Sequence, residues 1–339
     1  MPGFRGTQGA AAAVLAASCF AAWAGEKPPR EPLGLPRIEW PKSNPYSAAK
    51  AELGRYLYFD KRLSADNTVS CASCHEPDLA YADGAPVSTG IRGQKGGRSA
   101  PTVINRAYSR AQFWDGRAST LEEQAKGPIA NPIEMGNTYD AAVATLKKIA
   151  GYPPLFAKAF GSDSIDIERV AMAIATFERT VLSGNAPYDR YKKGDKKAMS
   201  PEQVRGMSVF FDKAKCDRCH ENVNFTLNAY SNIGVGMDKP NPDLGRYAIT
   251  NDPRDWGVFK IPTLRDVEHT APYMHDGSLK TLEEVVDFYN KGGIPNKNLD
   301  SNIRKLDLTE QDKKDLVAFL KALSGEGWQQ ALAPVEMPQ

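Results

Sequence analysis

The sequence predicts a mainly α-helical protein made of two similar halves. Apolar residues recur at helical spacing along the chain, as they do between Val170 and Val181. No segment alternates apolar and polar residues convincingly enough to predict a strand. The pentapeptide pattern C-x-x-C-H occurs twice, at 71–75 and 216–220, with similar residues around each copy. A duplicated, helical chain is therefore the expected fold.

The expected elements follow from amphipathic pattern and from helix-ending residues. The lead-in at 25–45 is rich in Pro, Lys and Glu and should be extended. Helices are expected at 47–60, 120–126, 139–150, 166–182, 201–211, 281–290 and 309–323. Ser200 should cap the fifth of these, and Gly127-Pro128 should end the second. Segments 83–99 and 228–257 should be loops, and the polar, basic segment 184–200 should be a linker.

Each C-x-x-C-H copy indicates covalent attachment of a c-type haem. Two cysteines three residues apart can form thioethers with the haem vinyl groups, and the adjacent histidine can bind the iron. The residues are Cys71, Cys74, His75, Cys216, Cys219 and His220. One copy alone could be a redox C-x-x-C or half of a zinc site. A zinc site is excluded by counting, because only His269 and His275 remain as nitrogen ligands, outside any Cys/His array.

The two halves align as an internal repeat around the haem motifs. Segment 54–60 matches 206–212 before the motifs, and Ala-Pro-Thr at 100–102 matches Ile-Pro-Thr at 261–263 after them. Asp-Gly followed after three residues by Thr-Leu-Glu-Glu occurs at 115–123 and again at 276–284. The sequence thus predicts two cytochrome c-like domains, 46–200 and 201–328, each with one covalently bound haem.

The repeat breaks at one position that bears on chemistry. Tyr289 lies eight residues after Thr281, whereas Pro128 lies eight residues after Thr120. If both helices cross the distal face of a haem, the second iron is offered a phenol oxygen and the first iron is offered no ligand. A core tyrosine packed against Val285 is the alternative interpretation of Tyr289.

Composition limits the possible partners and locations. Charged residues make up 25% of the chain and the net charge is +2, so no nucleic acid partner is indicated. Residues 1–24 resemble a signal peptide with an A-x-A cleavage site at 22–24, which predicts a periplasmic protein without a membrane span. A retained anchor and lipidation at Cys19 are the alternatives. After cleavage, every remaining cysteine belongs to a haem motif.

The motifs together resemble the bacterial di-haem cytochrome c peroxidase/MauG family over residues 45–325. Besides both haem motifs, the resemblance rests on Leu53-Gly54-Arg55, Phe59-Asp60, Ala100-Pro101-Thr102, Phe113-Trp114-Asp115-Gly116-Arg117, Glu123-Gln124-Ala125, Asn131-Pro132-Ile133-Glu134-Met135, Pro262-Thr263-Leu264-Arg265 and Thr270-Ala271-Pro272-Tyr273.

The resemblance favours the tyrosine-ligated, MauG-like branch of this family. Members of the peroxidase branch usually supply a methionine to the second iron, but segment 281–290 contains none, and 288–293 reads Phe-Tyr-Asn-Lys-Gly-Gly. Tyr289 is therefore the expected ligand opposite His220, with Met274 and His275 as competitors. No histidine lies between His75 and His220, so the first haem should be open at rest.

The resemblance also implies roles for other residues. Trp114 matches a tryptophan between the haems that carries electrons, and Glu134 and Gln124 match residues of the distal peroxide pocket. The side chain of Asn105 and the carbonyls of Thr270 and Pro272 match an inter-haem calcium site. Lys260 and Arg265 should meet haem propionates. The alternatives are core packing for Trp114 and solvated charges for the ionisable residues.

These expectations define a peroxide-dependent oxidoreductase. Hydrogen peroxide should react at the first haem, form a bis-Fe(IV) state, and drive oxidation of a partner protein at tryptophan. Trp256 is the nearest candidate for the electron exit. Two other functions stay open: a peroxidase that takes electrons from a small cytochrome or cupredoxin, and a passive electron carrier.

Overall fold

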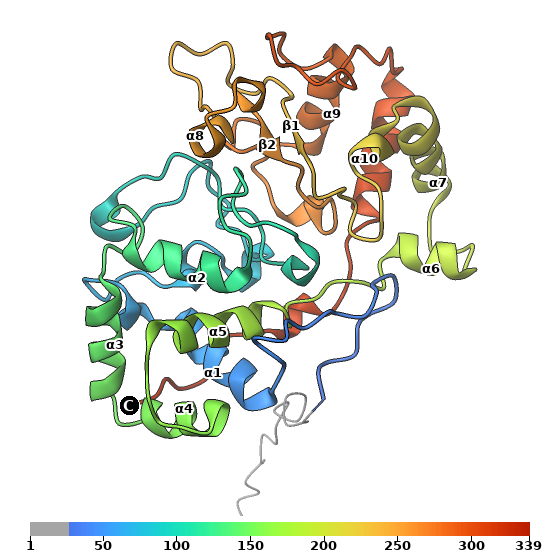
Figure 1. Cartoon of the computed structure of the whole chain (residues 1–339). Coiled ribbons are helices and arrows are strands. Elements are labelled where there is room, and N and C mark those ends of the chain that lie inside the picture. The colour runs from blue at the N-terminus through green and yellow to red at the C-terminus, as the bar shows by residue number, and fades with distance from the viewer. Residues whose placement is uncertain (1–26) are drawn as a thin grey trace, which may run out of the picture.

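The computed structural model describes residues 27–339, and the predicted signal peptide lies outside these residues. The described chain is mainly helical, as expected (Figure 1). Its helices are α1 (Ala48–Phe59), α2 (Leu121–Ala130), α3 (Tyr139–Lys148), α4 (Tyr152–Phe160), α5 (Ile167–Glu178), α6 (Pro187–Lys193), α7 (Pro201–Ser208), α8 (Tyr247–Thr250), α9 (Leu282–Lys291) and α10 (Glu310–Lys321). Two short strands, β1 (Tyr230–Ser231) and β2 (Phe259–Lys260), pair antiparallel.

Two separate hydrophobic cores correspond to the two halves of the repeat. In the first, α1 packs across α5, and in the second, α7 packs across α10 (Figure 1). Repeated glycines make these crossings close. A Cβ on Gly54 would lie 1.8 Å from the Ala173 carbonyl oxygen, and a Cβ on Gly206 would lie 1.8 Å from that of Asp315. Any larger residue at either position would force the helices apart.

The caps of the two site helices confirm the repeat at atomic detail. Thr120 accepts a hydrogen bond from the Glu123 amide at the start of α2, and Thr281 accepts one from Glu284 at the start of α9. Ser200 caps α7 in the same way, as predicted. Each cap satisfies an amide that has no partner inside the helix. Local sequence therefore sets where these helices begin.

The prediction that Gly127-Pro128 ends the second helix is wrong. Helix α2 continues to Ala130 with Pro128 inside its last turn. Proline lacks an amide hydrogen, so only the Gln124 carbonyl loses its usual donor. The Asn131 amide closes the turn instead, donating to the carbonyls of Gly127 and Pro128 at 3.1 and 3.3 Å. A proline this close to a helix end is therefore tolerated.

Three helices were not predicted from the sequence, and the shortest of them, α8, lies inside segment 228–257, which was expected to be a loop. Helix α4 begins with Tyr152-Pro153-Pro154, and α6 lies inside the segment expected to be a linker. Tyr188 and Tyr191 of α6 pack against the second core, as does Met199. The segment between the haem motifs therefore carries part of the second half's hydrophobic surface.

Both ends of the described chain are tied to the body. In the lead-in, Asn44 is buried and donates to Glu122 and to the Met172 carbonyl. At the other end, Trp328 and Ala331 belong to the first core, and the final residues run beside α3 and α4 (Figure 1). The Gln339 carbonyl accepts a 2.7 Å hydrogen bond from the Gly151 amide. Within residues 27–339, no helix is both long and apolar enough to cross a membrane.

Candidate functional site

The first haem motif opens onto a cavity of about 570 Å³. Cys71, Cys74 and His75 form one side of its lining. Helix α2 and the turn after it contribute Gln124, Pro128 and Glu134 to the same cavity. The structure thus brings together the predicted haem-attachment residues and both predicted distal-pocket residues.

The second motif opens onto a cavity of about 250 Å³. Cys216, Cys219 and His220 line it, and helix α9 contributes Tyr289. Tyr289 and Pro128 therefore occupy matching places in the two halves, each in the cavity of its own motif. The competitors Met274 and His275 also line the second cavity. His275 stacks on Phe259 with ring centroids 3.7 Å apart.

Both motif histidines are held by main-chain carbonyls. The Nδ1 atom of His75 lies 3.3 Å from the Tyr81 carbonyl oxygen, and that of His220 lies 3.0 Å from the Phe225 carbonyl oxygen. Burial lowers the pKa of both imidazoles, that of His220 to about 4. Each ring is therefore neutral, with Nδ1–H as donor and Nε2 available to a metal.

Trp114 stands in the wall between the two cavities and lines both. Its indole Nε1 donates to the Ser99 carbonyl at 2.8 Å, and its own carbonyl accepts from the Lys260 amide at 2.7 Å. The ring therefore has a fixed position between the halves. The wall residues lining both cavities are Ser99, Ala100, Pro101, Thr102, Arg106 and Trp114.

Glu134 is a half-buried carboxyl in the first cavity. Burial raises its pKa, while the Arg117 guanidinium and a 2.9 Å hydrogen bond from Asn131 Nδ2 act in the opposite direction. Arg117 is itself fixed, with its guanidinium 3.5 Å from the centroid of the Phe113 ring. A carboxyl group held in this way can accept and return a proton inside the cavity.

Comparisons with known proteins agree on one family. A family model described as di-haem cytochrome c peroxidase matches residues 48–197. The chain is 41% identical to the methylamine utilization protein MauG of Methylophilus methylotrophus, covering 90% of this chain and 91% of the relative. It is 38% identical to the cytochrome c551 peroxidase of Nitrosomonas europaea, covering 83% and 82%. This chain belongs to the di-haem cytochrome c peroxidase family.

A solved structure supports the same assignment. The crystal structure of a MauG-like protein associated with microbial copper homeostasis superposes with a TM-score of 0.84 and 36% identity, covering 90% of this chain and 98% of that one. This di-haem peroxidase is therefore an enzyme that uses hydrogen peroxide, with a c-type haem on each C-x-x-C-H motif. The two cavities fit that assignment, since each joins two cysteines to a neutral, oriented histidine.

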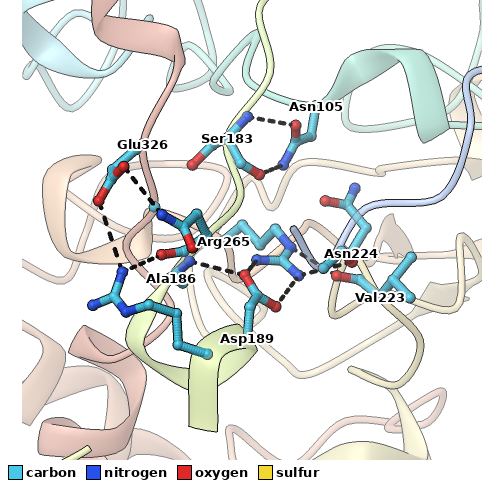
Figure 2. A network of polar contacts seen from close by, with 12 residues as sticks. Asn105, Ser183, Ala186, Asp189, Val223, Asn224, Arg265 and Glu326 are labelled. Carbon is cyan, nitrogen blue, oxygen red and sulfur yellow. Dashed lines mark hydrogen bonds and ion pairs between the residues drawn. The ribbon is translucent and has the colours of Figure 1, made fainter. Parts of the chain in front are cut away.

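Of the two residues predicted to meet haem propionates, only Lys260 lines a haem cavity. Lys260 is 3% exposed and lines the second cavity, so it can meet a propionate there. Arg265 lines neither cavity. Its guanidinium pairs with both carboxylate oxygens of Asp189 at 2.9 Å, and its Nε donates to the Val223 carbonyl (Figure 2). Arg265 thus joins α6 to the second half.

Two of the three predicted calcium donors line a haem cavity. Thr270 and Pro272 line the second cavity, but Asn105 lines neither cavity. Both atoms of the Asn105 amide are bonded to Ser183, donating to its carbonyl and accepting from its amide at 2.9 Å each (Figure 2). The amide of Asn105 therefore links two backbone segments. Within residues 27–339, no group of three or more His, Cys, Asp or Glu side chains is placed to hold a metal ion.

Sequence reasoning missed two buried ionisable residues at the cavities. Arg106 is 7% exposed and lines both. Glu178, at the end of α5, lines the first cavity, and its Oε2 atom has no hydrogen-bond partner in the described chain. Both lie outside the haem motifs, and Arg106 follows directly on Asn105. A buried charge with no partner cannot be recognised from the sequence, because burial depends on the fold.

Proposed function

We propose that this peroxidase uses hydrogen peroxide to oxidise a partner protein, at tryptophan, as a MauG-like maturation enzyme. The observation that carries the proposal is the pairing of Tyr289 in the second cavity with Pro128 in the first. A proline offers no metal ligand, whereas a phenol oxygen does. One iron is then accessible to peroxide, and the other is closed by a protein side chain.

The setting of Tyr289 supports its role as a ligand. No hydrogen bond is made by its hydroxyl within residues 27–339, although the ring lies in the second cavity with Cys216 and Cys219. Burial raises the pKa of the phenol, so it ionises only beside a cation. A haem iron held by His220 would be such a cation, and a hard phenolate oxygen from Tyr289 would favour its higher oxidation states.

The roles of the other residues follow from their places. Haems held by the two C-x-x-C-H motifs would supply the redox chemistry and would store the oxidising equivalents of the peroxide. Glu134 moves a proton between the peroxide oxygens, and Gln124 helps to position the peroxide. Trp114 lies in the shared wall, where an oxidisable indole can carry an electron from one side to the other. The partner then gives up electrons through the protein surface.

The test is to add hydrogen peroxide to the diferric protein and record near-infrared and Mössbauer spectra. Two Fe(IV) species and a near-infrared band are expected, and Tyr289→Phe should abolish both while leaving the haems attached. Tyr273→Phe is the matched control, because Tyr273 also lines the second cavity. Loss of the band in both variants, or in neither, would contradict the role of Tyr289.

The second candidate function is peroxide removal with electrons from a small cytochrome or cupredoxin. The 38% identity to the Nitrosomonas europaea cytochrome c551 peroxidase favours it. Steady-state turnover with reduced cytochrome c separates the two functions, since only this candidate requires rapid turnover. Under either function we place the mature protein in the periplasm, after removal of residues 1–24. Protein sequencing of the mature N-terminus checks this placement.

A further inference from the structure

Arg106 is a buried cation in the wall shared by the two haem cavities. It is carried by the turn after Ala-Pro-Thr, and its side chain lines both cavities. Its Nε donates to the Thr102 carbonyl at 2.8 Å, and its Nη1 lies 3.4 Å from Ser109 Oγ. Nη2 makes no hydrogen bond within residues 27–339. The guanidinium is therefore fixed in place, with donors left for another group.

The described chain supplies no anion for this cation. No carboxylate of residues 27–339 lies within ion-pair distance of Arg106 or of Lys260, although nearby Arg98 is paired with both Asp115 and Asp243. Glu178 is the acid whose ionised carboxylate would stabilise the Arg106 cation. Burial raises the Glu178 pKa to about 8, so this carboxyl is mostly neutral at pH 7 and does not compensate the arginine.

Lys260 is a second buried basic residue beside the same wall. Burial lowers its pKa well below the usual value, and the positive charge of Arg106 lowers it further. Keeping both side chains charged is therefore costly unless anions pair with them. Each haem carries two propionate carboxylates, and a guanidinium can bind carboxylates through parallel hydrogen bonds. The haems are thus the anion source that the chain lacks.

We propose that the Arg106 guanidinium bridges the two haems by pairing with a propionate of each. A positive charge favours the reduced form of a nearby iron, so Arg106 raises both reduction potentials. The inference requires the two haems and is independent of partner-protein oxidation.

The experiment measures both midpoint potentials of the purified di-haem protein by spectroelectrochemistry. Arg106→Met should lower both potentials, because one charge near both irons is removed. Arg106→Lys keeps the charge and should move them less. Lys260→Met is the matched comparison: Lys260 lines only the second cavity, so the second potential should fall more than the first. A shift of only one potential in Arg106→Met, or of neither, overturns the proposal.

Discussion

The Trp114 carbonyl accepts a 2.7 Å hydrogen bond from the Lys260 amide, which joins the two halves at the wall between the cavities. Lys260 also pairs with Tyr230 across the two short strands. The indole is therefore anchored from both halves of the molecule. Any change of ring chemistry at this place should leave the position of the ring intact.

Trp114→Phe should slow charge transfer between the haems without releasing either haem. A phenyl ring is harder to oxidise than an indole, and it also loses the bond to the Ser99 carbonyl. The near-infrared band after peroxide addition should weaken, while the absorption spectrum of the resting protein stays unchanged. An undiminished band would show that electrons take a different path.

Glu134→Gln should slow the reaction with peroxide by about 10²- to 10⁴-fold, the usual contribution of a positioned acid–base group. In the unmodified protein the rate constant should fall as the pH drops through the Glu134 pKa, which burial raises, because the protonated carboxyl cannot accept a proton. Stopped-flow measurements across pH test both statements.

The control for that experiment is Glu123→Gln in the first turn of α2. Glu123 is exposed, accepts from Ser119, and does not line the cavity. Its replacement should leave both the rate and its pH dependence unchanged. An acidic decline that persists in Glu134→Gln would assign the titration to another group.

Asp189→Asn should lower the free energy of unfolding by about 3–5 kcal/mol, because it leaves the Arg265 guanidinium buried without a counter-charge. Both side chains of this pair are almost fully buried, with exposed fractions of 1% and 3%. Denaturant unfolding monitored by circular dichroism measures the loss. Asp307→Asn removes an exposed pair with Lys305 and should cost under about 1 kcal/mol. Equal effects would contradict the assignment of Arg265 to structure.

Trp256 should collect oxygen adducts when peroxide is added without a partner protein. The centroids of the Trp256 and Tyr247 rings lie 5.1 Å apart, and the ammonium of the exposed Lys297 lies 5.2 Å from the Trp256 ring centroid. The Trp256 carbonyl accepts a hydrogen bond from the Asn232 side chain, beside the second cavity. Peptide mass spectrometry locates the adducts, with Trp40 as the control, since its ring packs against Tyr46 in the N-terminal lead-in. Equal modification of Trp40 would indicate unspecific damage instead of an exit route.

The sequence predicted the features that depend on local pattern. The haem motifs, the threonine caps and the paired glycines recur in both halves, so each copy supports the interpretation of the other. Chemistry that depends on distant partners was not predictable. Arg265 matches a family motif, yet its partner Asp189 lies 76 residues away in an unpredicted helix. The Asn105 amide likewise bonds to Ser183, which lies 78 residues further along the chain.

The burial of Arg106 was also not predictable from the sequence. Nothing in the segment 103–109 distinguishes a buried arginine from a solvated one, because the two cavities that it faces are formed by both halves together. Pro128 is an intermediate case. Its effect on the helix was overestimated, since the distance to the helix end decides the cost, and that end is set by Asn131.

The first half of the fold is completed by residues that follow the whole second half in the sequence. Trp328 and Ala331 fill the first core, the Tyr81 hydroxyl donates to the Ala331 carbonyl, and Arg62 donates to the Pro338 carbonyl. The first cavity therefore cannot reach its final packing before residues 328–338 have been synthesised. A chain cut short before residue 328 would lack this closure, so the first cavity is completed only after the residues of the second cavity exist.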